Sequence, residues 1–424
     1  MQNLIIYSPF KSAKLDYTIA FIFSKVQDVN IVIENSKENF ISATNYLKVN
    51  YGYENISGSL NICNSNYFKN FQLTLVPDFE EELNFINGTS AFDIFAATFF
   101  LLGRVEEYTT HEKDKHGRFP ITQNSLFKKQ IHRKPVIDLW IKKLLIQLNL
   151  EFDNQLNLNS NYSFLSTTDI DHIFAFREKP LWIQMGSLIK DLVRLKFNRV
   201  SDRFKSRDPY DRLDEMIRWN SKLGIQLKAF ALCAPRSEFD KSLSPDNPVF
   251  TTKLKSLAEK IQIGIHPSYQ SDINSEKIKA EKNQLEIILG KNIKISRQHF
   301  LKLRFPETYK ALIQNNISED YTMGFAEDIG FRAGTSKPFY WYDIETDEVT
   351  NLKVFPFQVM DVSLKQYLKL SPADAVTLVK EIVAEIKDVQ GQFGLIWHNS
   401  SFYEAEGWGG WEKAYRAILS LAQD

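Results

Sequence analysis

Apolar segments alternate with amphipathic helical segments throughout the second half of the chain, and this alternation limits the possible folds more than any other feature. From residue 160 onward the apolar segments are YSFLS, GIQLKAFAL, KIQIGIH, NIKISRQ, the stretch around 321–325, KVFPFQVM and FGLIWH. Strands that alternate with helices form βα units, in which neighbouring strands pair in parallel. About seven such units in roughly 260 residues predict an α/β fold of the (β/α) barrel type. An open doubly wound sheet is the alternative.

Three of the connecting helices carry recognisable end signals. Asp208 and Pro209 are predicted to be the N-cap and first turn of one helix, and Ser371 with Pro372 play the same parts in another. Gly290 is predicted to end a third helix, because glycine readily adopts the left-handed conformation of a C-cap.

The length of the chain, 424 residues, favours two domains over one. Residues 156–424 are predicted to form the barrel domain. Residues 1–155 are predicted to form a smaller α/β domain of unknown role, because LIIYS and NIVIEN have the composition of strands and residues 91–102 that of a buried helix.

Composition excludes several classes of function. Lys+Arg and Asp+Glu both number 52, so no overall field attracts nucleic acid or an anionic membrane. The first residues lack the basic and apolar regions of a signal peptide, and no apolar stretch reaches membrane-spanning length. We therefore expect a cytoplasmic protein without an integral membrane segment. Cys63 and Cys233 lie too far apart for a zinc finger or a disulfide framework.

Residues 187–207 form a basic stretch, SLIKDLVRLKFNRVSDRFKSR. Such a stretch can contact an anionic lipid or a sugar. A solvated helix face is the more common explanation of this pattern.

The motif STTDIDH follows the first apolar segment of the predicted barrel and ends it abruptly. Asp169 and Asp171 are two residues apart, so they share one face of an extended chain. Two neighbouring carboxylates repel each other unless a cation or a shared proton relieves the repulsion. The motif therefore indicates a site, with an acidic turn as the alternative, since aspartate also favours turns.

Four histidines end or follow apolar segments of the same region: His172, His266, His299 and His398. In a parallel barrel the carboxyl ends of the strands meet at one mouth, where catalytic residues lie. Aspartate and histidine together are ligands of a borderline divalent metal. The histidines and the aspartate pair therefore predict a metal site at that mouth.

These motifs resemble those of the NodB-like polysaccharide deacetylases, carbohydrate esterase family 4. The similar segments are TTDIDH, HPSYQ, SRQHF, DYTMGF with GFRAGTSKPF, and LIWH. The chain also resembles bacterial proteins that join such a domain to an uncharacterised N-terminal domain, through FFLLGRVEEY and KHGRFP. The resemblance implies a distorted (β/α)7 barrel and a divalent metal, with zinc as the expected ion, that serves to remove acetyl groups from sugars.

The resemblance implies a role for each matched residue. Asp169 corresponds to the catalytic base, Arg297 to the residue that orients it, and His398 to the catalytic histidine of the last strand. Asp171 and His266 correspond to metal ligands.

The third metal ligand departs from the family pattern. Gln270 stands where the second histidine of the HPSYQ motif belongs, and glutamine is a poor zinc ligand. His299 lies two residues after Arg297 and shares its face if the strand continues, so we prefer it. Gln270 is the second choice. His172 is the third, because it should point away from its neighbour Asp171.

Three further residues are predicted to contact substrate: Asp320, Arg332 and Trp408. Arg332 lies among small residues and suits an anion or a hydroxyl group, although a glycine-rich turn with a surface arginine is the alternative. Trp408 offers a flat surface for a sugar ring, although buried packing is the more common role. Asp361 follows an apolar segment and is a candidate to orient His398.

A polar cluster in the first 155 residues is predicted to contact the barrel mouth or the substrate, with an ordinary polar loop as the alternative. Its members are Glu106, Glu107, Asp114, His116 and Arg118.

The function expected from these residues is metal-dependent deacetylation of a carbohydrate amide or ester. The expected partner is a carbohydrate, for instance a precursor of a surface polysaccharide, and no nucleic acid is expected. Two alternatives are an allantoinase-like hydrolase of a small amide and a carbohydrate-binding protein that has kept the fold but lost the metal.

Overall fold

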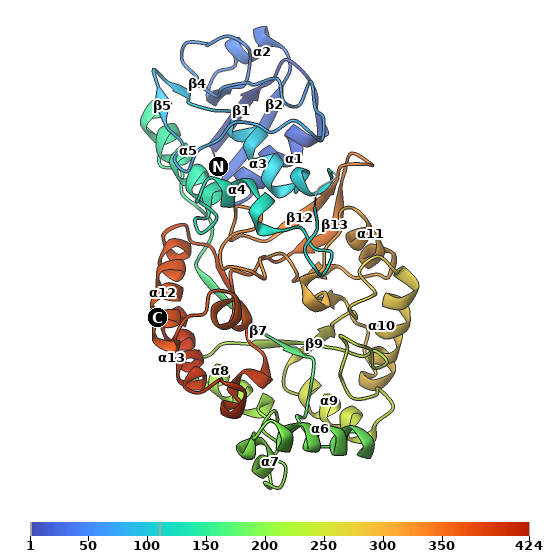
Figure 1. The fold of residues 1–424 in the computed structure, drawn as a ribbon. Coiled ribbons are helices and arrows are strands. Elements are labelled where there is room, and N and C mark those ends of the chain that lie inside the picture. The colour runs from blue at the N-terminus through green and yellow to red at the C-terminus, as the bar shows by residue number, and fades with distance from the viewer. Residues whose placement is uncertain (1, 110–111, 424) are drawn as a thin grey trace.

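The computed structural model describes residues 2–109 and 112–423 and contains a smaller and a larger β-sheet (Figure 1). The smaller sheet has the order β2-β1-β3-β4-β6-β5, and its pairs are parallel except for β5 with β6. Its strands are β1 (Gln2–Tyr7), β2 (Val29–Glu34), β3 (Leu47–Asn50), β4 (Leu60–Asn61), β5 (Phe85–Ile86) and β6 (Thr89–Ser90). The two strands predicted from LIIYS and NIVIEN are β1 and β2.

Five α-helices accompany the smaller sheet in the described part of the first 155 residues. They are α1 (Ala13–Phe23), α2 (Lys37–Ser42), α3 (Ile94–Leu102), α4 (Ser125–Lys128) and α5 (Val136–Phe152). Helix α3 is buried along its whole length, as its uniformly apolar sequence predicts, and Asp93 caps its first turn by accepting from the N–H of Ala96. It packs against α1 on one side and against β12 of the larger sheet on the other.

The larger sheet has nine strands in the order β12-β13-β11-β10-β9-β8-β7-β15-β14. Its strands are β7 (Ser163–Ile170), β8 (Leu227–Ala231), β9 (Gln262–Ile265), β10 (Ile295–Ser296), β11 (Glu319–Asp320), β12 (Phe339–Asp343), β13 (Glu348–Val354), β14 (Val359–Met360) and β15 (Gln392–Ile396). Among these strands the β12–β13 hairpin is the antiparallel pair, and the others are parallel. Strands β7 to β11 are neighbours in chain order, as successive βα units require.

The larger sheet is curled, and the chain after β13 bonds both to the segment that ends β11 and to β15, near opposite ends of the strand order. The backbone N–H groups of Phe355, Phe357 and Gln358 donate to the carbonyl oxygens of Asp320, Met323 and Gly394, over 2.8, 3.0 and 3.0 Å. Residues 355–358 thereby connect the end of β11 to β15. The α/β class, with a small sheet followed by a curled and largely parallel one, is confirmed.

Helices surround the strands of the larger sheet (Figure 1). They are α6 (Leu181–Val193), α7 (Phe197–Asp202), α8 (Leu213–Lys222), α9 (Pro248–Ala258), α10 (Ser275–Leu289), α11 (Glu307–Gln314), α12 (Pro372–Asp388) and α13 (Trp411–Gln423). Two predicted end signals are confirmed. Ser371 caps α12, and Gly290 ends α10 with a φ of 64°.

The prediction that Asp208 and Pro209 begin a helix is wrong. Helix α8 begins at Leu213, and the carboxylate of Asp208 accepts hydrogen bonds from the backbone N–H groups of Ala175, Phe176 and Arg177 instead. An aspartate followed by proline has the local pattern of an N-cap, but here its oxygens satisfy the loop that follows β7.

One hydrophobic core extends through both sheets. It includes Leu4 of β1, Phe99 of α3, Phe339 of β12 and Leu419 of α13. The predicted domain boundary at residues 155 and 156 falls between α5 and β7. No helix in the described ranges combines the length and apolar character needed to cross a membrane.

Candidate metal centre

Polar side chains meet at the carboxyl end of β7 and of its parallel neighbours. Asp169 is the second-last residue of β7, and Asp171 comes directly after the strand. The neighbouring strands β9, β10 and β15 end at the same edge of the sheet. They bring His266, Arg297, His299 and His398 to the two aspartates.

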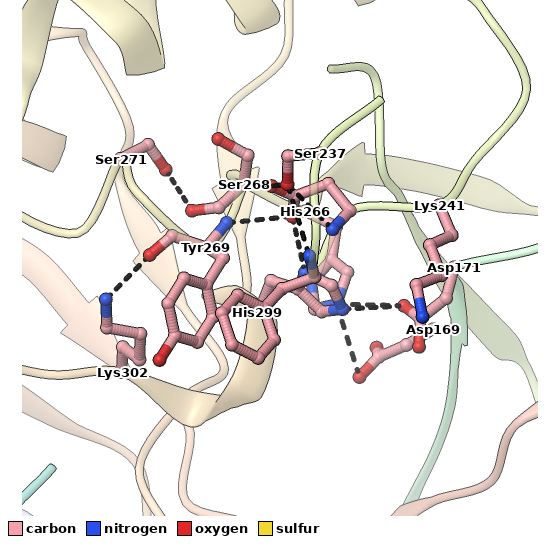
Figure 2. Close-up of polar contacts among 12 residues, drawn as sticks. Asp169, Asp171, Ser237, Lys241, His266, Ser268, Tyr269, Ser271, His299 and Lys302 are labelled. Atoms are coloured by element: carbon pink, nitrogen blue, oxygen red, sulfur yellow. Dashed lines mark hydrogen bonds and ion pairs between the residues drawn. The ribbon is translucent and has the colours of Figure 1, made fainter. Parts of the chain in front are cut away.

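Asp171, His266 and His299 form a cluster whose ligand atoms lie within 4.8 Å of one another. The Oδ1 atom of Asp171 is 3.3 Å from Nε2 of His266 and 3.7 Å from Nε2 of His299. Figure 2 shows both imidazole rings directed toward Asp169 and Asp171 at the end of β7. The side chain of Asp171 is 26% exposed, so the cluster can be reached from outside, whereas both histidines are buried.

The second nitrogen of each imidazole is engaged by the protein. Nδ1 of His266 lies 2.6 Å from the carbonyl oxygen of Arg297, and Nδ1 of His299 lies 2.8 Å from Oδ1 of Asp240. A proton held on Nδ1 by these acceptors leaves the Nε2 lone pair facing Asp171. This is how proteins usually orient a metal-binding histidine.

The cluster fits a divalent metal ion. Nitrogen and oxygen ligands bound at about 2.1 Å around a tetrahedral ion lie about 3.4 Å apart, which is close to both Asp171–histidine distances. The buried Oδ1 atom of Asp171 has no hydrogen-bond partner among the described residues. Two imidazoles and one carboxylate form a donor set that suits zinc.

The electrostatics of the cluster also favour a cation. Burial lowers the pKa of His299, but Asp171 and Asp240 outweigh it and raise that pKa to about 9. Burial raises the pKa of Asp171, but His299 and His266 outweigh it and hold the pKa well below its usual value. The carboxylates thus attract positive charge, and a bound metal would take the place of the imidazole proton.

Asp169 is held beside this cluster by a buried arginine. Nη1 of Arg297 donates to Oδ1 of Asp169 over 2.8 Å, and Nη2 donates to Oγ1 of Thr167 over 2.9 Å. Nε of the same guanidinium donates to the carbonyl oxygen of Tyr321. The arginine therefore leaves Oδ2 of Asp169 directed toward the histidines, 4.0 Å from Nε2 of His266.

His398 completes the group from the end of β15. Its Nε2 atom lies 3.9 Å from an oxygen of Asp169 and 3.9 Å from an oxygen of Asp171. Asp361 makes two contacts with His398. One carboxylate oxygen lies 2.8 Å from Nδ1 of the ring, and the other accepts a hydrogen bond from the backbone N–H. Burial lowers the pKa of His398, but Asp361 and the two site aspartates outweigh it and raise that pKa to about 10.

The two alternative third ligands lie away from the cluster. Gln270 is exposed, and its side-chain oxygen accepts from Nζ of Lys277. His172 places Nδ1 3.0 Å from the carbonyl oxygen of Lys241. The structure therefore brings His299 together with Asp171 and His266, and it does not bring Gln270 or His172 there.

The three predicted substrate contacts are buried. Asp320 accepts from Oγ1 of Thr322 and from the hydroxyl of Tyr309, and burial raises its pKa to about 6 despite these bonds. Arg332 forms an ion pair with Glu107. Trp408 lies under Nζ of Lys365, which is 4.0 Å from its ring centre. Their role in substrate binding stays a prediction.

Part of the polar cluster predicted in the first 155 residues contacts residues beside the candidate metal centre. Nδ1 of His116 lies 3.2 Å from the hydroxyl of Tyr269, and Arg118 donates to the carbonyl oxygen of Phe300, the residue after His299. The rings of Tyr269 and Phe239 stack at 4.0 Å. A partly exposed group of aromatic rings therefore lies beside His299.

Asp240 was not predicted from the sequence. It lies in the polar loop between β8 and α9, where RSEFDKS carries no periodic or spacing signal. Its carboxylate accepts from the backbone N–H of Tyr269 and from Oγ of Ser237 while it contacts His299. A contact between two loops of this kind depends on the order of the strands, which no local pattern reveals.

Replacement of Asp240 by asparagine is expected to weaken divalent-metal affinity by about 10- to 100-fold, the usual effect of losing a carboxylate that orients a histidine ligand. The amide keeps the size of the side chain but removes its charge. Titration calorimetry with zinc would measure the change. Asp246→Asn is the matched control, because Asp246 is an exposed residue of the same loop. Equal affinities of Asp240→Asn and the wild type would contradict this support role.

Comparison with known families gives one match, to the first part of the chain. Residues 4–153 match the family described as "Family of unknown function (DUF7033)". No curated protein sequence matches the chain.

Solved structures similar to this chain include three proteins that are named as deacetylases, all at low sequence identity. One is a "putative polysaccharide deacetylase" from Mycobacterium smegmatis, which shares 14% identity with this chain. Another is a "probable polysaccharide deacetylase" from Pseudomonas aeruginosa PAO1, which shares 11% identity. Each has a TM-score of 0.40. Both matches cover 62% of this chain, and they cover 84% and 85% of the other chains. The carbohydrate deacetylase Agd3 shares 9% identity over 68% of this chain and 54% of its own, with a TM-score of 0.37. TM-scores this low do not assign this chain to a fold family or a function.

Proposed function

We propose that the protein is a metal-dependent deacetylase that hydrolyses an acetyl amide or ester on a carbohydrate. The observation that carries this proposal is the juxtaposition of the Asp171, His266 and His299 cluster with two other polar pairs. These pairs are Arg297 with Asp169 and Asp361 with His398, and both lie within about 4 Å of the cluster. A metal ligand set, a base and a proton donor are the groups that amide or ester hydrolysis requires.

A divalent ion, proposed to be zinc, would be held by Asp171, His266 and His299 and would polarise the acyl carbonyl. Asp169 acts as the general base and accepts a proton from the attacking water at Oδ2. Arg297 occupies Oδ1 of the same carboxylate, and so fixes its orientation. This positioning keeps the basic oxygen directed toward the ligand cluster.

His398 acts as the general acid. Its Nε2–H gives a proton to the leaving amine or hydroxyl as the bond to the acyl carbon breaks. Asp361 holds the opposite nitrogen, which fixes the ring and stabilises its protonated form. Despite burial, Asp361 raises the pKa of His398, which favours the protonated ring that a proton donor requires.

The aromatic rings beside His299 support a carbohydrate as the substrate. Tyr269, Phe239, Phe300 and His116 are each partly exposed and lie against one another. Aromatic faces beside polar groups suit a sugar ring, which has apolar C–H faces and polar edges. The substrate class proposed here is therefore an acetylated sugar.

The proposal is tested by measuring acetate release from a panel of N- and O-acetylated amino sugars with zinc, cobalt or nickel present. We expect His398→Ala to lower kcat by about 10²- to 10⁴-fold, the usual contribution of a positioned proton donor. Metal content should stay at the wild-type level, because His398 is outside the ligand cluster.

His172→Ala is the matched control, since His172 also follows a strand of the larger sheet but is bound to the carbonyl oxygen of Lys241 and is not one of the clustered ligands. Equal rates for wild type and His398→Ala would exclude the proton-donor role. A wild-type protein that binds metal and sugars but releases no acetate would instead indicate a carbohydrate-binding protein.

A further inference from the structure

The segment between β7 and α8 has its apolar side chains outside and a charged one inside. Helix α6 buries Asp191, which forms ion pairs with Arg199 and Arg203 of the following segment. Helices of soluble proteins normally bury their apolar stripe and expose their charges. The reversed arrangement in α6 indicates that its outer face meets an apolar environment.

The exposed apolar residues of α6 follow a helical repeat and continue beyond the helix. Trp182 is 74% exposed, Val193 77% and Phe204 79%. The full set consists of Leu181, Trp182, Met185, Ile189, Leu192, Val193, Leu195, Phe197 and Phe204. Single exposed apolar residues are common, but a contiguous set of this size marks an interaction surface.

The same segment is strongly basic. Residues 177–207 contain nine Lys or Arg and three Asp or Glu, although the whole chain is balanced at 52 of each. The acidic side chains Asp191 and Asp202 are occupied by ion pairs with Arg199, Arg203 and Lys205. Lys190, Arg194 and Lys196 are exposed among the apolar residues. The outer surface of the segment is therefore both apolar and positively charged.

The segment is anchored firmly to the larger sheet. Arg199 and Tyr210 both contact Glu406, which lies after β15. Within the segment, Asp208 accepts three backbone N–H groups from the loop after β7. Arg203 lies over the ring of Phe176. The apolar side chains are thus presented outward on an ordered support, away from the hydrophobic core.

We propose that α6 and α7 dock the protein onto the surface of an anionic lipid membrane. An in-plane helix with tryptophan, leucine and isoleucine on one face and lysine and arginine around it has the chemistry of a membrane-surface helix. Helix α6 has 13 residues and is about 20 Å long, too short to span a bilayer core of about 30 Å. It therefore binds at the interface. The basic residues select anionic headgroups.

The docking surface lies on the same side of the larger sheet as the metal centre. The chain leaves the carboxyl end of β7 at Asp171 and enters α6 ten residues later. Figure 1 places α6 and α7 at the end of the molecule opposite the smaller sheet. Docking through α6 and α7 would therefore leave the smaller sheet remote from the membrane. This proposal does not depend on deacetylase activity.

Flotation of the full chain with lipid vesicles tests the proposal. We expect binding to vesicles of phosphatidylcholine with phosphatidylglycerol, much weaker binding to phosphatidylcholine alone, and loss of binding at high salt. Trp182→Ser should weaken binding by about 10- to 100-fold, because a large apolar side chain no longer enters the interface. Each of Lys190→Gln, Arg194→Gln and Lys196→Gln should weaken it by about fivefold.

Matched controls keep the result specific to this segment. Ile287 of α10 is 75% exposed, so Ile287→Ser removes an equally exposed apolar side chain elsewhere, and Lys380→Gln does the same for a basic residue of α12. Both controls should bind vesicles like the wild type. All of the substituted side chains are exposed, so the variants should fold normally, which circular dichroism would verify.

Two results would overturn the proposal. One is wild-type protein that does not float with anionic vesicles. The other is a wild-type dimer in size-exclusion chromatography with light scattering that becomes monomeric in Trp182→Ser, since this surface would then join two copies of the chain. A monomeric wild type that floats with anionic vesicles supports membrane docking.

Discussion

Replacement of Asp171 by alanine is expected to lower the affinity for a divalent metal by more than about a hundredfold and to remove acetate release with it. Asp171 supplies the carboxylate oxygen that lies nearest to both histidines, and a change to a ligand costs more than the 10- to 100-fold typical of an outer contact. Metal content after dialysis, measured by plasma mass spectrometry, would show the loss.

His266→Ala and His299→Ala should behave in the same way, because each removes one imidazole of the cluster. Gln270→Ala is the matched control, since Gln270 is exposed and contacts Lys277. It should retain a full equivalent of metal. Loss of metal in Gln270→Ala but not in His299→Ala would instead make Gln270 the third ligand.

Replacement of Glu107 by glutamine is expected to lower the free energy of unfolding by about 3 to 5 kcal/mol, the usual cost of breaking a buried ion pair. Both oxygens of Glu107 accept from Arg332, at 3.0 and 2.6 Å, and one also accepts from Arg104. Arg104 in turn donates to the carbonyl oxygen of Arg332. The variant leaves the buried guanidinium of Arg332 without its carboxylate partner, whereas Arg104 keeps its ion pair with Glu106.

The same network makes a prediction about pH. Burial raises the pKa of Glu107, but Arg332 and Arg104 outweigh it and lower the pKa to about 2, from an ordinary value of 4.5. A carboxylate with a depressed pKa stabilises the fold at a pH above its unfolded value. This stabilisation, about 3 kcal/mol, is lost as the pH falls from about 4.5 through about 2. Urea unfolding of the wild type and of Glu107→Gln should therefore converge in this acidic range.

Glu54→Gln is the matched control for this network. Glu54 pairs with Lys37 at the surface, where both side chains are largely exposed, so its loss should change the free energy of unfolding by less than about 1 kcal/mol. Equal stabilities of Glu107→Gln and Glu54→Gln would show that the buried network contributes nothing. Glu107 lies in the part of the chain that forms the smaller sheet, and Arg332 lies in the part that forms the larger sheet. The experiment therefore also measures how much this ion pair stabilises the contact between the two parts.

The local sequence pattern was sufficient to predict the α/β class and to bring together the residues of the candidate site. Alternating apolar segments indicated the parallel strands, and the i, i+2 spacing of Asp169 and Asp171 placed both at the end of one strand. Parallel strands present their carboxyl ends at a single edge, so His266, His299 and His398 could be expected there together. The preference for His299 over Gln270 also followed from spacing along the chain.

Contacts between distant loops could not be predicted from these patterns. Asp240 supports His299 across 59 residues of chain, and Glu107 pairs with Arg332 across 225. Asp208 carries the local signal of a helix start, but its carboxylate binds backbone N–H groups about 30 residues away. A polar side chain takes whichever partner the folded chain brings within about 3 Å, and that distance depends on strand order and loop path.

The exposed face of α6 illustrates the same division. The sequence alone determines that residues 181–193 can form an amphipathic helix, because apolar residues recur at helical spacing. It does not determine which face turns inward. Only the tertiary structure decided this, because Arg199 and Arg203 draw Asp191 into the protein and thereby leave Trp182 and Val193 outside. Periodicity is a property of neighbouring residues, whereas burial is a property of the whole fold.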